Sequence, residues 1–146
     1  MQTMMIELIP VSKLRPYAKN ARNHSRKQIR QIADSIKAFG FTNPVLIGDD
    51  NEIIAGHGRV DAARLLQMES VPTVRLSHLN AAQRRAYVIA DNKLALNAGW
   101  DHELLAIELQ ALIDLDFGVE LTGFSLAEVD LVLDEARESS TAAPSD

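Results

Sequence analysis

The sequence predicts an α+β protein, with a small mixed β-sheet in its first half followed by a helical C-terminal section. Short apolar runs bounded by turn residues indicate strands at residues 6–10, 45–47, 52–55 and 71–76. From residue 80 onward the apolar residues recur instead at helical spacing. Only 5% of the 146 residues are aromatic, so the core is expected to consist of leucine, isoleucine, valine and alanine.

Each element of the first half has a local reason to form. Pro10 predicts that the first strand lies at an edge of the sheet, because proline cannot donate a ladder hydrogen bond. Ser25 is an N-cap for a helix that ends at Gly40. The turn residues 48–51 join the second and third strands into a hairpin, and a helix over residues 59–68 leads to the fourth strand.

Three further helices are expected in the second half, each with its own N-cap. Asn80, Asp101 and Ser125 occupy the cap positions, and Ser125 with Glu128 fits a capping box. Trp100, the only tryptophan, is expected to fill the core where two of these helices meet. The predicted division is an α+β domain at residues 1–79, a helical section at residues 80–138 and a flexible tail or linker at residues 139–146.

Charge is distributed unevenly along the chain. Residues 1–100 carry 14 Lys/Arg and 8 Asp/Glu, a sum of +6, whereas residues 101–146 carry 1 Arg and 12 Asp/Glu, a sum of −11, which together give the net charge of −5. No acid occurs between Glu7 and Asp34, a stretch that holds seven basic residues. This stretch is either a polyanion-binding surface or an ordinary solvated face, and charge alone does not separate the two.

Three absences from the sequence narrow the expected location. There is no apolar run of the roughly 18 residues that a membrane helix needs, no basic and apolar signal at the N-terminus, and no cysteine. We therefore expect a cytoplasmic protein with no membrane association, no disulfides and no thiolate chemistry.

The turn Gly56-His57-Gly58-Arg59 is the strongest candidate binding site, because it lies between a predicted strand and a predicted helix. A helix N-terminus presents unpaired N–H groups and a partial positive charge of roughly half a unit, both of which favour phosphate. The glycines let a ligand approach the backbone, and Arg59 can grip the same phosphate. His57 can donate a hydrogen bond or lie against a base or sugar.

A purely structural role also accounts for this turn. In that interpretation the glycines only close a tight turn, His57 faces solvent, and Arg59 pairs with Asp61 or Asp91. The motif is not a Walker A loop, since the Lys-Ser/Thr pair is missing, and not a dinucleotide fingerprint, since the third glycine is missing. Asp91 and Asn92 are poor residues for a helix interior, and our hypothesis is that they bond to the loop and support it.

Several stretches of the chain together resemble a known family. They are Leu14-Arg15-Pro16, Asn43-Pro44-Val45-Leu46-Ile47, the run from Ile53 to Ala63 that contains the turn, and Val71-Pro72-Thr73-Val74. In this order, over residues 5–80, they resemble the N-terminal domain of the ParB/sulfiredoxin superfamily. The stretches Asn80 to Asp101 and Leu121 to Ser125 further resemble the ParB-like domains found ahead of phage- and plasmid-type DNA methyltransferases.

The resemblance implies a ParB/sulfiredoxin-like fold that binds a nucleoside triphosphate, CTP or ATP, with Mg²⁺. In ParB proteins a Gly-Glu-Arg-Arg motif at this turn contacts the triphosphate of CTP. This chain keeps the first Gly and the last Arg but has His and Gly between them, so metal-assisted hydrolysis of CTP is not implied. The residues expected to bind phosphate or nucleotide are Gly56, His57, Gly58, Arg59, Arg15, Asn20 and Arg22.

Other functions within the superfamily are the alternatives. They are a nucleotide hydrolase, a phosphotransferase or a nuclease, or a dimerisation domain with a degenerate pocket. Sulfiredoxin chemistry is excluded because it needs a thiolate and the chain has no cysteine. The four histidines show no metal-ligand spacing, so no metal site is predicted. The chain carries no methyltransferase motif, so methylation would require another domain or protein.

Contacts with DNA are expected to rest on basic residues of two predicted helices. The weaker candidates for this role are Arg26, Lys27, Arg30, Arg84 and Arg85, with a mixed-charge solvent face as the alternative for the last two. No helix-turn-helix is evident, and the acidic helices after Asp101 argue against DNA binding there. Their apolar stripes suit packing on each other or in a homodimer. The expected partners are DNA or nucleotide, a methyltransferase domain or protein, and a second copy of the chain.

Overall fold

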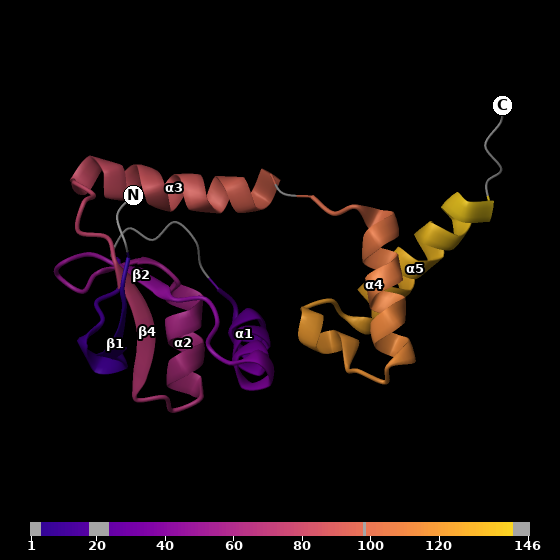
Figure 1. Cartoon of the computed structure of the whole chain (residues 1–146), viewed down its shortest axis with the longest axis horizontal. Helices are drawn as coiled ribbons and strands as arrows, with labels where there is room; N and C mark the ends of the chain where they lie inside the picture. Colours follow the sequence, from indigo (N-terminus) through magenta and orange to yellow (C-terminus); the bar gives the residue numbers. More distant parts are fainter. Residues whose placement is uncertain (1–3, 18–23, 98, 142–146) are drawn as a thin grey trace. The chain divides into compact units, whose positions relative to one another are not determined.

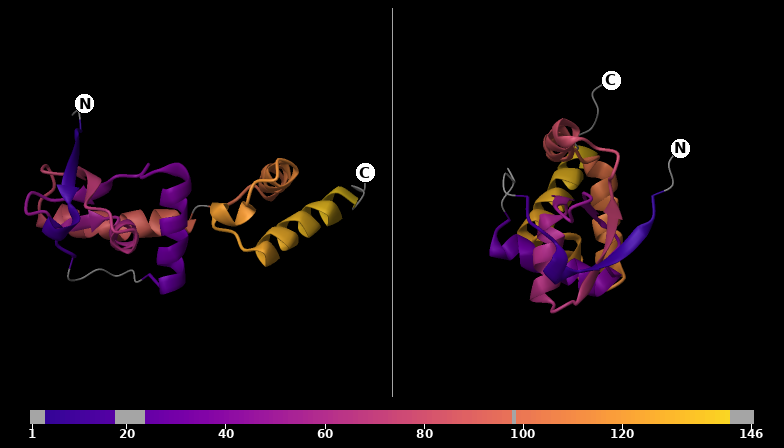
Figure 2. Two further views of the ribbon diagram at one scale, coloured as in Figure 1. Left: turned by 90° about the horizontal axis from the view of Figure 1, so that it is seen from below. Right: turned by 90° about the vertical axis from the view of Figure 1, so that its left-hand side faces the viewer.

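A mixed four-stranded sheet organises the first part of the chain (Figure 1). The computed structural model describes residues 4–17, 24–97 and 99–141. Across the sheet the strands follow the order β1 (Ile6–Pro10), β4 (Ser70–Arg75), β2 (Val45–Ile47) and β3 (Ile53–Ala55). The outer pairs are antiparallel and the central pair, β4 with β2, is parallel. The predicted α+β class, the hairpin and the edge position of β1 are confirmed, and Figure 2 shows β1 on the outside of the sheet.

The helices of this part begin and end where the sequence supplies caps. A single 3-10 turn, η1 (Val11–Lys13), follows β1. Ser25 and Gln28 form a complete capping box at the start of α1 (Arg26–Phe39), and Gly40 ends it with a φ of 86°. Asn80 caps α3 (Ala81–Asn97) in the same reciprocal way with Gln83. Only α2 (His57–Leu65) departs from expectation, because it starts two residues before Arg59 and ends three residues before Met68, the predicted limits.

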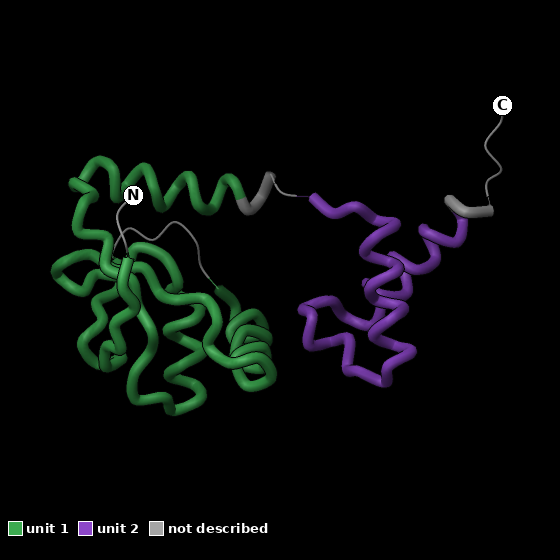
Figure 3. Tube along the Cα trace, viewed as in Figure 1, with its two compact units in different colours: residues 1–97 green, residues 98–146 purple. Residues whose placement is uncertain are grey.

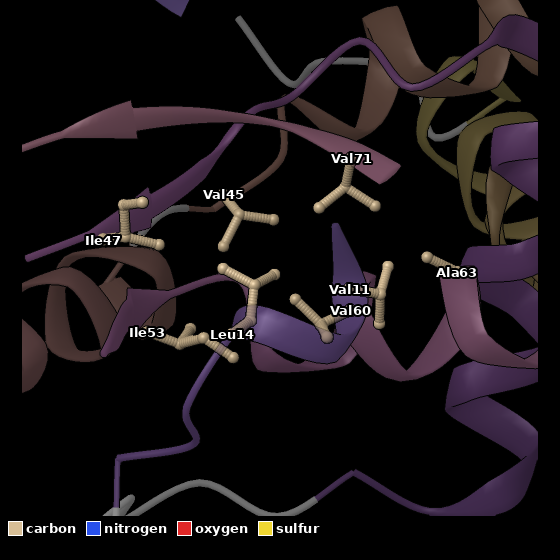
Figure 4. Packing of buried hydrophobic residues seen from close by; sticks show 8 residues of the cluster. All are labelled: Val11, Leu14, Val45, Ile47, Ile53, Val60, Ala63 and Val71. Carbon is tan, nitrogen blue, oxygen red and sulfur yellow. The ribbon is translucent and has the colours of Figure 1, made fainter. Parts of the chain in front are cut away.

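Apolar side chains cover both faces of the sheet. On one face β2, β3 and β4 pack against α2 and η1, and Figure 4 shows this cluster: Val11, Leu14, Val45, Ile47, Ile53, Val60, Ala63 and Val71. On the other face Ile54, Val74 and Leu76 pack against Val88 of α3. α1 contacts the sheet indirectly, because it packs on α2. The sheet is thus a central layer that fixes α2 and α3 on opposite sides.

The remaining residues form a second unit of helices. α4 (His102–Asp114) starts at Asp101, whose carboxylate accepts from the Leu104 N–H, and α5 (Leu126–Thr141) starts at the predicted Ser125–Glu128 capping box. A short 3-10 turn, η2 (Val119–Thr122), lies between them. These helices share a core of their own, which consists of Ala106, Leu109, Val119, Val129 and Val132.

The chain forms two compact units, residues 1–97 and residues 98–146 (Figure 3). α3 belongs to the first unit because Tyr87 and Val88 pack on the sheet. The division into an α+β domain at residues 1–79 and a helical section from residue 80 stays a prediction. Trp100 is 63% exposed and only leans on Phe124, at 5.6 Å between ring centroids, so the prediction that it fills a core was wrong.

Candidate anion-binding site

The strand-to-helix turn leaves the N-terminus of α2 without a side-chain cap. β3 ends at Ala55, and Gly56 is the N-cap residue in the left-handed conformation, with φ of 107°. A residue with a side chain is strained there, and glycine supplies no capping oxygen. Among the described residues, no side-chain cap hydrogen bond is made to the amides of His57, Gly58 and Arg59 that open the helix. Such a terminus favours an anion through its N–H groups and its partial positive charge.

The guanidinium of Arg59 folds back over this helix start. Its Nη2 donates to the Pro44 carbonyl at 3.0 Å and lies only 3.0 Å from the point where a Cβ on Gly56 would be. Its Nε is buried and has no hydrogen-bond partner among the described residues. Arg59 also forms no salt bridge within the described part of the chain. A buried donor without an acceptor is costly, and an anionic ligand would remove that cost.

Burial of the Arg59 guanidinium lowers its pKa, while the nearby Asp91 and Tyr87 act to raise it. An arginine remains charged despite such a shift. Burial in turn raises the pKa of the Tyr87 phenol, and Asp91 adds to that effect. Arg59 is thus a permanent cation at the helix start, and it interacts electrostatically with Asp91 and Tyr87 of α3.

His57 connects the segment that ends at Tyr17 to the turn. Its Nε2 accepts a hydrogen bond from the backbone N–H of Tyr17 at 3.1 Å, across 40 residues of sequence. Burial lowers the pKa of His57; Asp61 and Glu52 act to raise it and His24 to lower it further. The imidazole is therefore neutral near pH 7, with its proton on Nδ1. Nδ1–H is the donor that remains, so the prediction that His57 donates to a ligand or lies against it stays a prediction.

A cavity of about 130 Å³ opens beside the turn. The turn and the start of α2 line it on one side. The other lining residues include Asp91 and Asn92 of α3, Ile32 of α1, and His24, which lies just before α1. Gly58 is buried, and a Cβ there would lie 2.9 Å from Ile32 Cδ1 and 3.0 Å from His24 Nε2. Part of the reason for this glycine is therefore the close approach of α1 to α2.

Arg15, the other predicted phosphate-binding residue that the structure describes, does not line this cavity. The Arg15 side chain is 63% exposed and pairs with Asp50 at 3.6 Å, while its backbone bonds to Asn51 and Ile53 beside β3. Asn20 and Arg22 lie outside the described residues. Arg26, Lys27 and Arg30 are exposed along α1. Their roles in binding nucleotide or DNA stay predictions.

Arg84 and Arg85 have different surroundings although they are adjacent. The Arg84 guanidinium lies on Gly48 and forms salt bridges with Asp50 at 3.4 Å and Glu52 at 3.1 Å, with only 19% of its side chain exposed. Arg85 is exposed. Arg84 is thus committed to the hairpin turn, and only Arg85 of this pair presents its charge to solvent.

Sequence reasoning missed some residues of the site and placed others only loosely. His24 and Tyr17 carried no sequence signal, because neither has a motif and both reach the turn only through the fold. Asp91 and Asn92 were singled out as unusual, and both do line the cavity. Asn92 donates to the Val88 carbonyl within its own helix. The carboxylate and amide of this pair provide oxygen atoms opposite the cation of Arg59.

Metal ligation by protein groups alone is not supported. Within the described ranges no cluster of three or more His, Asp or Glu side chains is suited to hold a metal ion. A magnesium ion usually keeps one or two carboxylates and completes its shell with waters and phosphate oxygens. Asp91 and Asn92 fit that more limited role.

The family assignment follows from the sequence of this first unit. Residues 1–93 match the model of the ParB N-terminal domain, which spans the sheet, the turn and most of α3. The chain belongs to the ParB N-terminal domain family. Residues 103–146 match the ParB-methyltransferase HTH domain, a helix-turn-helix module that the sequence pattern had not revealed to us.

Individual ParB-like relatives agree with this assignment. The chain is 57% identical, over 76 residues, to a ParB-like nuclease domain-containing protein, YnaK, of Escherichia coli; the match covers 52% of this chain and 87% of YnaK. It is 27% identical over 92 residues to a probable chromosome-partitioning protein ParB of Rickettsia felis, covering 62% of this chain but only 32% of that one. The chain thus spans about a third of that partition protein.

A solved ParB structure shares the fold. The C-terminally truncated chromosome-partitioning protein ParB of Caulobacter crescentus, complexed with CTP-gamma-S, superposes with a TM-score of 0.71, covering 95% of this chain and 88% of that one. Identity is 17%, so the likeness is one of fold. Among the described helices of the present chain, none is long and apolar enough to cross a membrane.

Proposed function

We propose that the turn from Gly56 to Arg59 binds the phosphates of a nucleoside triphosphate, and that CTP is the preferred nucleotide. The observation that carries the proposal is the Arg59 guanidinium, whose Nε is buried without a partner beside an uncapped helix N-terminus. The same family includes a ParB that has been crystallised with a CTP analogue. A helix start and a guanidinium together supply both the backbone and the side-chain donors that phosphate requires.

The volume of the cavity limits which part of a nucleotide it can hold. A cavity of about 130 Å³ is far below the size typical of a pocket that encloses a whole drug-sized ligand. The phosphates would therefore occupy the cavity, while sugar and base lie outside it, on the side where the described segment that ends at Tyr17 meets the turn. His57 fixes that segment to the turn through the Tyr17 amide, and is a positioning residue in this scheme.

A magnesium ion is part of the proposal only as a companion of the phosphates. When bound, it would neutralise phosphate charge. Asp91 and Asn92 would hold it from the α3 side, opposite Arg59. The carboxylate of Asp91 would otherwise repel an anion in the same cavity, so nucleotide binding should depend on Mg²⁺ in this chain.

The wider role that we propose is that of a nucleotide-responsive module in a DNA modification or partition system. The match to a ParB-methyltransferase HTH domain favours the first of these systems. Association with a methyltransferase, action as a homodimer and a cytoplasmic location belong to this proposal. A nucleotide-bound ParB is described in the same fold, whereas no hydrolytic step follows from the residues at this turn.

Titration calorimetry of the full chain with CTP, ATP and S-adenosylmethionine, with and without Mg²⁺, tests the proposal. Arg59→Met is the test variant and Arg64→Met its control, since Arg64 lies on the same helix but is exposed and pairs with Asp61. Loss of a charge-assisted contact to phosphate predicts about a tenfold or larger loss of CTP affinity for Arg59→Met and little change for Arg64→Met. Absence of any nucleotide binding by the folded wild-type chain would refute the proposal.

A further inference from the structure

The second unit is strongly acidic for a helix-turn-helix module. Residues 101–146 carry twelve acids and one arginine, and the helix-turn-helix match covers almost the same residues. Sequence-independent affinity for DNA comes from Lys and Arg that neutralise phosphates, and this unit offers only Arg137, which pairs with Asp134 at 3.4 Å. The charge of this unit therefore opposes DNA binding and favours a basic partner.

The same unit exposes large apolar side chains. Leu104, Ile107 and Leu131 are each about 60% exposed, although the unit already has a core of its own. Leu104 and Ile107 lie three residues apart on α4 and so share a face, whereas Leu131 lies on α5. Exposed apolar side chains that share a surface mark interaction sites more often than isolated ones do.

A groove lies along α4 and α5 on this unit. Its volume is about 680 Å³. Its apolar lining comes from Ala106, Ile107 and Ala111 of α4 and from Leu133 and Ala136 of α5. The polar residues that line it are Glu103, Gln110, Asp114 and Arg137. Alanines in a helix surface let another helix approach closely, and Ile107 supplies the one large side chain of α4 in that lining.

We propose that this groove is the docking site for an amphipathic helix of a partner protein that carries Lys or Arg beside its apolar face. An apolar groove between helices is a recurrent receptor for such a helix, which inserts apolar anchors at spacings of i, i+3, i+4 and i+7. The occupant is basic because the groove has two acids, Glu103 and Asp114, and a single cation, Arg137, which is paired with Asp134. The net charge of residues 101–146, −11, acts in the same direction. This inference is independent of the nucleotide site.

A synthetic peptide with the sequence of residues 24–40 serves as the probe of this chemistry. It combines four basic residues and one acid with isoleucines at helical spacing. In the protein the corresponding helix is already packed on α2, so the free peptide represents a class of partner. Fluorescence anisotropy of the labelled peptide would be followed as the full chain is added. We expect binding that weakens when NaCl is raised from about 50 mM to about 500 mM, because the attraction is screened.

Two matched variants of the full chain locate the binding surface. Ile107→Gln removes an exposed side chain that lines the groove, and Leu131→Gln removes one of nearly equal exposure that does not. We expect Ile107→Gln to weaken peptide binding about tenfold and Leu131→Gln less than about twofold. Methyl chemical shifts of Ala106, Ala111 and Ala136 should move on binding in the wild-type chain. Circular dichroism checks that both variants keep their helices.

Four results would overturn the inference. One is the absence of peptide binding to the folded chain. Another is equal binding by a peptide whose four basic residues are replaced by glutamine. A third is binding of a DNA duplex that Ile107→Gln weakens, which would make the groove a nucleic-acid surface. The last is a dimer, seen by sedimentation, that Ile107→Gln dissociates, since a second copy would then cover the groove.

Discussion

At the scale of single residues, His57 is the side chain whose chemistry depends most on the fold. Its sequence position predicted contact with a ligand, yet its Nε2 is used by the Tyr17 amide. The partner is 40 residues away, so no local pattern could reveal it. Since a neutral imidazole accepts and a protonated one cannot, this contact is sensitive to pH.

We predict that the stability of the first unit falls in mild acid because of His57. Its pKa in the folded chain is below the ordinary value of 6.5, chiefly through burial, so the unfolded chain binds the proton more readily. The stabilisation is therefore present above pH 6.5 and is lost as the pH falls through the lowered pKa. Urea unfolding between about pH 8 and about pH 5 measures it.

Two variants identify the histidine responsible. His57→Gln keeps an acceptor that does not titrate and should flatten the pH dependence, whereas the exposed His78→Gln should leave it unchanged. The amide of Tyr17 should exchange with solvent faster in His57→Ala than in His57→Gln. An identical pH slope in His57→Gln and the wild-type chain would show that another group is responsible.

Gly56 is predicted to be irreplaceable for both folding and binding. Its φ of 107° disfavours any side chain, and a Cβ there would meet the Arg59 guanidinium at 3.0 Å. Gly56→Ala should lower the free energy of unfolding by about 1–3 kcal/mol and displace Arg59 from the cavity. Gly118→Ala is the control, because a Cβ there meets nothing within 4 Å and its φ is −68°. Equal unfolding midpoints for the two variants would contradict this account.

At the scale of elements, two parts of α3 have different contacts: its start binds the hairpin turn and its middle lines the cavity. Arg84, near the start, is held by Asp50 and Glu52 of the hairpin turn. Asp91 and Asn92, two turns later, line the cavity. By binding Arg84, the hairpin turn helps to position α3, and with it Asp91 and Asn92 at the proposed site. Neighbouring residues on a helix point about 100° apart, which is why Arg84 faces the hairpin while Arg85 faces solvent.

The two arginines should differ sharply in their effect on stability. Arg84→Met leaves the half-buried Glu52 carboxylate without its cation, and should lower the free energy of unfolding by about 1–3 kcal/mol. Arg85→Met should change it by less than about 0.5 kcal/mol, as is usual for an exposed side chain. Denaturant unfolding of both variants measures the difference. Similar losses would mean that Arg84 contributes as little as a surface ion pair.

Sequence patterns located the elements better than they located the contacts between them. Caps at Ser25, Asn80, Asp101 and Ser125 are local, so they could be predicted, and the structure confirms each one. The assignment of α3 to the sheet depends on Val88, which meets strands that precede it by many residues. For the same reason Gly56 and Arg59 could be placed at a helix start from sequence, whereas His24 and Tyr17 could not be placed beside them.

At the scale of the whole molecule, two units with separate cores carry opposite charge. In the part of the chain that the structure describes, the clusters around the sheet extend no further than Val88, and the helical cluster begins at Leu105. The first hundred residues sum to +6 and the rest to −11. The charges therefore favour phosphate binding by the first unit and a basic partner for the second.

Separate cores predict that a nucleotide stabilises one unit and not the other. A ligand that binds only the folded state adds about 2.7 kcal/mol at a hundred times its Kd. If CTP with Mg²⁺ binds at Gly56, amide exchange should slow in β3, α2 and α3 and stay unchanged in α4 and α5. Mass spectrometry of exchange in the full chain measures both units in one sample, with Arg59→Met as the control that should lose the protection.

Equal protection of both units would show that they unfold together, because the ligand would then stabilise residues that share none of its contacts. Protection in neither unit, at a concentration where calorimetry detects CTP, would place the nucleotide elsewhere than at the turn.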